Sequence, residues 1–118
     1  MPGDARRRST PRFSDSQVRS LTDYISENMA RQLSLTELAE FLHLRPRQFF
    51  RLFCNTFRQT PYRYLMHERV RRAKELLSAG SSQTEIANLM GFENEDHFKQ
   101  TFERIAGTSA RRFKRENA

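Results

Sequence analysis

Cysteine and long apolar runs are nearly absent from this sequence of 118 residues. The single Cys54 excludes an internal disulfide and fits a reducing compartment. No apolar run approaches the roughly 18 residues that a membrane-spanning helix needs. The arginines near the N-terminus are not followed by the apolar core of a secretory signal. We therefore expect a cytoplasmic protein with no membrane partner.

Strand patterns and catalytic motifs are missing as well. No stretch alternates apolar and polar residues as a half-buried strand does, and proline and glycine fall between helical patterns. There is no Ser/His/Asp order, no glycine-rich phosphate loop and no pair of carboxylates in a predicted cleft. The histidines His43, His67 and His97 are scattered over separate elements, which argues against a zinc site. The sequence predicts an all-α protein that is not an enzyme and needs no cofactor.

Acidic residues are scarce in the middle of the chain. The whole sequence carries a net charge of +7, but residues 43–74 hold nine lysines and arginines against Glu68 alone, a net +8. Residues 75–98, which follow, sum to −5. This balance favours a polyanionic partner, with nucleic acid first and an anionic membrane second.

The sequence does contain a series of helical patterns. The longest covers residues 61–77, where Pro61 suits the first helical position, Thr60 precedes it as an N-cap and Gly80 ends it. Further helices are expected near residues 15–30, 36–42, 46–57, 83–90, 93–106 and 109–117. Residues 1–13 have little to bury; they form either a disordered tail or linker, or a basic arm that touches phosphate or a minor groove.

Two segments on either side of the longest helix repeat one another. TELAEFL at 36–42 aligns with TEIANLM at 84–90, and Phe49 and Phe53 then align with Phe98 and Phe102 at an offset of 49. The order in each copy is a short helix, a tight turn and a longer helix, which indicates a duplicated helix-turn-helix. The turns are expected to need a positive φ, supplied by Gly91 in the second copy and by His43 in the first.

These motifs give the chain a specific resemblance. TELAEFL followed by residues 46–53, then TPYRYL, then EIANLMGF followed by His97-Phe98 and Phe102, resemble the DNA-binding domain of the AraC/XylS family of bacterial transcription regulators. The resemblance covers about residues 15–116. It implies seven helices, with two helix-turn-helix units joined by one linker helix. We therefore divide the chain into an arm or linker (1–13), a first subdomain (14–60), a linker helix (61–80) and a second subdomain (81–118).

The chain departs from the family pattern in a few places. The family usually has Gly where Arg58 stands, an aromatic residue at Ala106 and Pro at Ala110. Most members also carry an effector or dimerisation domain, for which 118 residues leave no room. The sequence is therefore either a short stand-alone member or a C-terminal fragment.

The first recognition helix is expected to read bases from the major groove. By periodicity Phe49, Leu52 and Phe53 point inward. The residues left outside or at the edge are Arg47, Gln48, Phe50 and Arg51. Arginine suits bidentate contact with guanine, and the resemblance also implies base reading at Arg47, Phe50 and Arg51. The alternatives are that the arginines grip phosphate or cover a solvated face, and that Phe50 belongs to the core instead of contacting thymine methyl groups.

The second recognition helix offers a different surface. The residues expected to face outward, by periodicity and by the resemblance, are Glu95, Asp96, His97 and Gln100. Glu95 can accept a hydrogen bond from cytosine and Gln100 can read adenine, but two carboxylates are repelled by phosphate. We therefore expect weaker or less discriminating binding by this unit. For His97 a capping or packing role is the alternative.

Phosphate contacts are expected from basic residues near helix N-termini. The candidates are Arg45, Arg58, Arg63, Lys99, Arg111 and Arg112. Arg69 lies on the inward stripe of the long helix and is expected to partner a carboxylate inside the protein. A linker helix of about 18 residues would span roughly 27 Å, which suits two readers in adjacent major grooves about 34 Å apart.

The favoured function is sequence-specific binding of double-stranded promoter DNA by a bacterial, nucleoid-associated transcription regulator. The main alternative is an adaptor that binds a protein, such as RNA polymerase, through the acidic region 75–96. Binding of RNA is third, because it needs exposed aromatic platforms and Phe50 is the only candidate.

Overall fold

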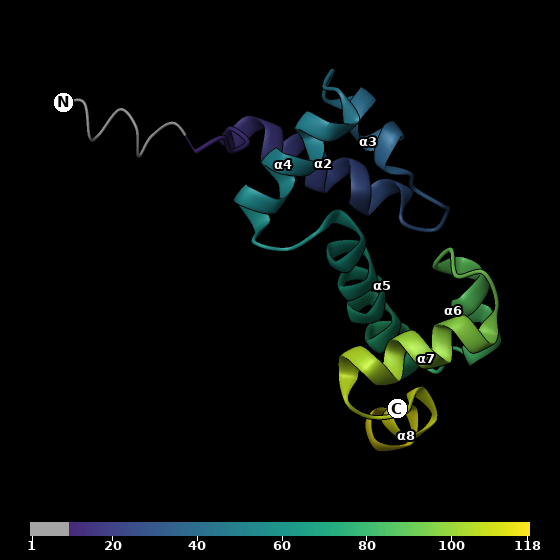
Figure 1. Ribbon diagram of the computed structural model, residues 1–118. Coiled ribbons are helices and arrows are strands. Elements are labelled where there is room, and N and C mark those ends of the chain that lie inside the picture. The colour runs from purple at the N-terminus through teal and green to yellow at the C-terminus, as the bar shows by residue number, and fades with distance from the viewer. Residues whose placement is uncertain (1–9) are drawn as a thin grey trace. The chain divides into compact units, whose positions relative to one another are not determined.

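The computed structural model of the chain describes residues 10–118, and every regular element in that range is an α-helix (Figure 1). Seven helices follow one another: α2 (Asp15–Asn28), α3 (Leu35–Phe41), α4 (Pro46–Phe57), α5 (Pro61–Ser78), α6 (Gln83–Leu89), α7 (Glu95–Ala106) and α8 (Ala110–Asn117). The all-α prediction is confirmed. In this part of the chain no helix is long and apolar enough to cross a membrane.

Polar caps and positive φ angles set the ends of these helices. The side chains of Ser34, Asn94 and Ser109 each accept a hydrogen bond from a backbone N–H in the first turn of the helix that follows. The predicted positive φ angles in the two turns are confirmed, at 59° for His43 and 71° for Gly91. A serine or asparagine directly before a helical pattern is a local signal. For α7 the expected start at residue 93 is two residues too early, because Asn94 is the cap and the helix begins at Glu95.

The described chain divides into two compact units. Unit 1 contains the described residues up to Ser26 together with Leu33–Tyr64, and unit 2 contains Glu27–Gln32 together with Leu65–Ala118. The predicted linker segment 61–80 is therefore not a unit of its own. The first turn of α5 belongs to unit 1 and the rest of the helix to unit 2.

Unit 1 is built around an aromatic core in which α3 packs against α4. Phe13 lies in this core, only 6 % exposed, with its ring centroid 5.5 Å from that of Phe49 and 6.3 Å from that of Phe53. Its amide donates a hydrogen bond to Thr56 Oγ1 at 2.8 Å. The predicted boundary after residue 13 therefore falls too late, because Phe13 is part of the first unit. The rest of the predicted basic arm, residues 1–9, lies outside the described residues.

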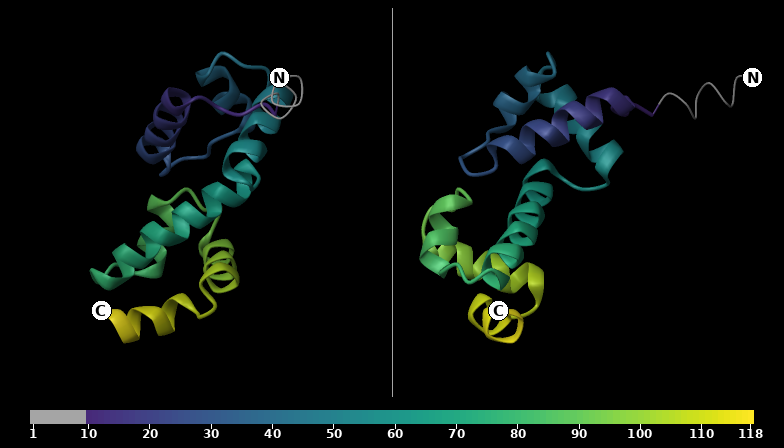
Figure 2. Two further views of the ribbon diagram at one scale, coloured as in Figure 1. Left: turned by 90° about the vertical axis from the view of Figure 1, so that its left-hand side faces the viewer. Right: turned by 180° about the vertical axis from the view of Figure 1, so that it is seen from behind.

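Unit 2 has a second aromatic core, in which α7 packs against both α6 and α8. Phe98 and Phe102 are fully buried, and Phe102 meets Phe113 of α8 edge to face with ring centroids 5.7 Å apart. Figure 2 shows α7, in yellow-green, followed by α8, in yellow, at the C-terminal end of this unit. The small Ala87, 3 % exposed, lets the two helices of the second pair approach closely.

Candidate nucleic-acid interface

Helix α4 separates its buried and exposed residues cleanly. Phe49 and Phe53 are fully buried and Leu52 is 9 % exposed. On the opposite arc Arg47, Gln48, Phe50 and Arg51 are all exposed. At 100° per residue Arg47 and Arg51 occupy the middle of this arc, with Phe50 at one edge and Gln48 at the other. Helix α4 therefore presents an exposed face of polar and aromatic side chains.

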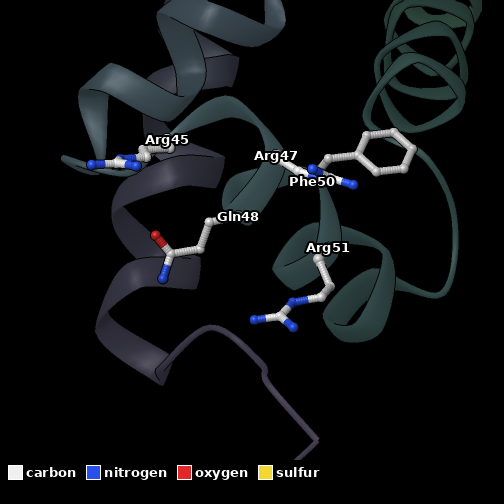
Figure 3. Close-up of a pocket in the computed structure, with 5 residues that line it drawn as sticks. All are labelled: Arg45, Arg47, Gln48, Phe50 and Arg51. Carbon is white, nitrogen blue, oxygen red and sulfur yellow. The ribbon is translucent and has the colours of Figure 1, made fainter.

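The exposed residues of α4, together with Arg45 at its N-cap, line one open hollow of about 540 Å³ (Figure 3). Three guanidinium groups, one amide and one aromatic ring lie in it, and the sequence of α4 contains no acidic residue. Phe50 is 42 % exposed, so of the two alternatives for this ring the core is excluded. The hollow combines donors for base edges with an apolar ring of the kind that contacts a thymine methyl group.

Helix α7 carries the matching positions of the second pair. At the offset of 49, Asp96 and Gln100 stand where Arg47 and Arg51 stand in α4, and both are exposed. A carboxylate thus replaces a guanidinium in the middle of the outward face. Such a face can accept a hydrogen bond from cytosine but is repelled by the DNA backbone.

Two of the candidate readers on α7 are engaged within unit 2. Glu95 accepts a hydrogen bond from Thr84 Oγ1 at 3.1 Å and lies 3.6 Å from Lys99 Nζ. His97 is half-buried, and its ring meets that of Phe92 edge to face with centroids 5.4 Å apart. Its backbone N–H is capped by Asn94 Oδ1 at 2.8 Å. Between base reading and packing, these contacts favour packing for His97.

The six phosphate candidates are divided between the two units. Unit 1 holds Arg45, Arg58 and Arg63, and unit 2 holds Lys99, Arg111 and Arg112; all six are exposed. Lys99 forms an ion pair with Glu95, and Arg112 forms one with Glu116, with Nε 3.1 Å from Oε2. The cations of unit 1 have no such partner among the described ion pairs, which leaves them the stronger candidates for phosphate.

Sequence reasoning did not single out two further exposed side chains, Arg104 and Tyr62. Arg104 is exposed and follows Gln100 by four residues on α7, so helical spacing alone could have found it. Tyr62, in the first turn of α5, is 58 % exposed. No periodic signal marks Tyr62, because it lies within one turn of the helix start. Arg69, by contrast, is 3 % exposed and donates a hydrogen bond to the backbone carbonyl of Arg31.

The described residues offer no cluster of metal ligands outside this surface: no three His, Cys, Asp or Glu side chains among them are grouped to hold a metal ion. Cys54 is a half-buried free thiol in α4.

Comparisons with known proteins fit this arrangement. A helix-turn-helix domain family matches residues 38–116. The probable transcriptional regulator LumQ of Photobacterium leiognathi is 29% identical over 113 residues, which cover 91% of this chain and 46% of that protein. The transcriptional activator RhaS of Yersinia pestis is 32% identical over 98 residues, covering 82% of this chain and 36% of that protein. The chain thus spans less than half the length of these curated relatives.

Solved structures show the same fold. The DNA-binding domain of the global transcriptional factor AdpA, solved in complex with a target DNA, superposes with a TM-score of 0.80 and is 25% identical, covering 87% of this chain and 93% of that one. The duplicated helix-turn-helix, the family match and these relatives together show that the chain belongs to the AraC/XylS family of bacterial transcription regulators and represents its DNA-binding domain.

Proposed function

We propose that this chain binds double-stranded promoter DNA sequence-specifically, through α4 and α7, as part of a transcription regulator. The observation that carries the proposal is the exposed face of α4 together with its N-cap residue Arg45, where three arginines, a glutamine and a phenylalanine line one hollow with no acidic residue on the helix. The DNA complex of AdpA, a domain of the same fold, supports it. Such a role places the protein at the bacterial nucleoid.

The chemistry of α4 suits direct reading of base edges. Arg47 and Arg51 can each make a bidentate pair with guanine, Gln48 can pair with adenine, and Phe50 can pack on a thymine methyl group. Each good bidentate pair contributes about 1–3 kcal/mol of discrimination. We therefore assign the larger share of sequence reading to the first unit.

The second unit adds a weaker reader. Asp96 and Gln100 can recognise cytosine and adenine, but α7 carries three acidic residues against Lys99 and Arg104. The 18 residues of α5 span about 27 Å, somewhat less than the roughly 34 Å between successive major grooves. We infer that both helices enter adjacent grooves of one site with some bending of the DNA.

Selection from a random pool of double-stranded DNA tests the proposal. We expect enrichment of an asymmetric site of about two turns, and an affinity that falls steeply with salt because lysines and arginines displace counterions from phosphate. Failure to enrich any sequence, with binding that depends on salt alone, would contradict sequence-specific recognition.

RNA polymerase is a second candidate partner, because α6 exposes an apolar side chain beside acidic ones. Leu89 is 51 % exposed, and Glu93 is exposed shortly after it. Glu93→Lys should abolish transcription activation while leaving the affinity for DNA intact or increased. Glu85 is a poor test position because its carboxylate caps α6. Unchanged activation by Glu93→Lys would count against this partner.

A further inference from the structure

The turn between α6 and α7 is held by two groups that come from outside this helix pair. Gln32 Nε2 donates a hydrogen bond to the carbonyl oxygen of Gly91 at 2.7 Å. Arg69 of α5, 3 % exposed, donates from Nη2 to the carbonyl oxygen of Arg31 at 2.9 Å. The guanidinium of Arg69 also lies over the ring of Phe92, 6.0 Å from its centroid. All of these residues belong to unit 2.

The three segments meet with no spare space at Gly91. A Cβ on Gly91 would lie 3.2 Å from the carbonyl carbon and oxygen of Arg31 and 3.2 Å from Nη2 of Arg69. The turn therefore packs directly on residues 31–32 and on the guanidinium. Because two of these three neighbours are backbone atoms, a side chain here could be accommodated only by moving the chain.

Phe92 carries this contact to the recognition helix. Its ring meets the ring of Phe98 at 5.2 Å and that of His97 at 5.4 Å between centroids, both edge to face. His97 and Phe98 lie in the first turns of α7, directly after Asp96. A shift of Phe92 would therefore rotate or translate the end of α7 that reads bases, and a binding site tolerates displacements of only about 0.5 Å.

We propose that Arg69 and Gln32 are positioning residues for α7, which set the base discrimination of the second unit without touching DNA. These two side chains fix the position of Gly91 and Phe92. Phe92 then fixes the first residues of the recognition helix α7. This inference rests on the proposed DNA-binding function and assigns a specificity role to side chains that lie outside the helix-turn-helix pair itself.

The test compares two variants with two matched controls on a panel of DNA duplexes. The variants are Arg69→Met, which keeps the length of the side chain but removes its donors, and Gln32→Ala. The controls are Arg71→Met, on the same helix but exposed and paired with Glu68 and Glu75, and Asn88→Ala, which removes an exposed amide from α6 of the same unit. The duplexes are the selected site and versions with either the first-unit half or the second-unit half scrambled.

We expect the two variants to lose discrimination only in the second half. The affinity ratio between the selected site and the site scrambled in its second half should fall at least about fivefold. The corresponding ratio for the first half and the slope of affinity against salt should stay unchanged, because neither side chain meets phosphate. Arg69→Lys, which restores a donor, should recover part of the loss, and both controls should behave as the unaltered chain.

Three outcomes would overturn the proposal: an unchanged second-half ratio in a folded variant, an equal loss in both halves, or a shallower salt slope. Gln32 is exposed, so Gln32→Ala decides the question even where the buried Arg69→Met fails to fold. If the unaltered chain shows no preference for any selected site, the proposed function itself fails. If the preference for the second half of the selected site survives both substitutions, only the proposed positioning role is contradicted.

Discussion

Arg51 lies in the middle of the exposed arc of α4, in a hollow with Arg45 and Arg47 and no acidic neighbour on the helix. Because no carboxylate on α4 competes for it, the exposed guanidinium of Arg51 is available to pair with guanine. Arg51→Ala should weaken binding to the selected site by about 1–3 kcal/mol and relax specificity at one base pair. Fluorescence anisotropy titrations would measure this.

Arg19→Ala supplies the control for charge alone, because Arg19 is exposed on α2 but does not line the hollow. If the two substitutions weakened binding equally and for every sequence, Arg51 would be a phosphate contact and not a base reader.

Arg58 illustrates a conflict between stability and binding at one residue. It is the C-cap of α4, with φ at 60° in the left-handed region that costs a side chain about 1–2 kcal/mol. Arg58→Gly should therefore raise the free energy of unfolding by about 0.5–1 kcal/mol, after the greater entropy of glycine in the unfolded chain is subtracted. The salt slope of DNA binding should fall by about one.

Arg58→Ala is the matched comparison, because it removes the same charge but keeps the Cβ. It should reproduce the change in salt slope without the gain in stability. A glycine variant no more stable than the alanine variant, in urea denaturation, would show that the left-handed backbone is not strained.

Single residues also mark where sequence reasoning reaches its limit. Periodicity placed Arg47 and Arg51 outside correctly, because they lie in the middle of the exposed arc. It could not decide Phe50, which lies at the edge of that arc. Phe13 was missed because its aromatic partners in the core lie 36 or more residues away in sequence. The hydrogen bond of Arg69 to the backbone carbonyl of Arg31 has no local signal in the sequence either.

At the scale of the element, α6 depends on its capping box. The side chain of Ser82 accepts from the backbone of Glu85, and the carboxylate of Glu85 accepts from the backbone N–H of Ser82 at 2.9 Å. The hydrogen bond from the Ser82 backbone, followed by that from its side chain, lowers the pKa of Glu85. The carboxylate therefore contributes stability above the ordinary glutamate pKa of about 4.3, and this contribution disappears as the pH falls through the lower pKa of the folded state.

Glu85→Gln isolates the charge in this cap, because the amide oxygen can still accept the hydrogen bond. The variant should melt at a lower temperature than the unaltered chain at pH 7, and the two melting curves should converge as the pH falls below about 4. Circular dichroism melts across this range would test it. A gap that persists or widens at low pH would show that the charge is not what stabilises the cap.

The two glycine turns that flank α7 differ in their surroundings. Gly91 and Gly107 have similar φ angles, 71° and 77°, but a Cβ at Gly107 meets nothing within 4 Å whereas one at Gly91 meets the Arg31 backbone at 3.2 Å. Gly107→Ala should cost only the left-handed backbone conformation less the greater entropy of glycine in the unfolded chain, about 0.5–1 kcal/mol, and Gly91→Ala should cost more. An equal loss of unfolding free energy for the two variants, measured by chemical denaturation, would mean that the residues packed around Gly91 can move to accommodate a Cβ.

Helix boundaries were the part of the fold most open to prediction. Prolines at the first position of α4 and α5, and serine or asparagine before α3, α6, α7 and α8, mark helix starts in a purely local way. The division of the chain into two units was harder to predict from the sequence. Residues 27–32 belong with unit 2 although their neighbours on both sides belong to unit 1, and no local pattern shows that.

For the whole molecule, the two readers have unequal charge. The outward face of α4 carries Arg47 and Arg51, whereas the matching positions of α7 carry Asp96 and Gln100. Because phosphate repulsion opposes α7 and phosphate attraction assists α4, we expect the first unit to supply most of the affinity and most of the discrimination.

The most direct test of this central claim compares Arg47→Ala/Arg51→Ala with Asp96→Ala/Gln100→Ala on the selected site at one salt concentration. We predict that the first pair of substitutions weakens specific binding by several kcal/mol, given about 1–3 kcal/mol for each base-reading arginine. The second pair should have a smaller effect on affinity, because the loss of base contacts is offset by the removal of a carboxylate. Unchanged binding after the first pair, or a larger loss after the second, would contradict the account.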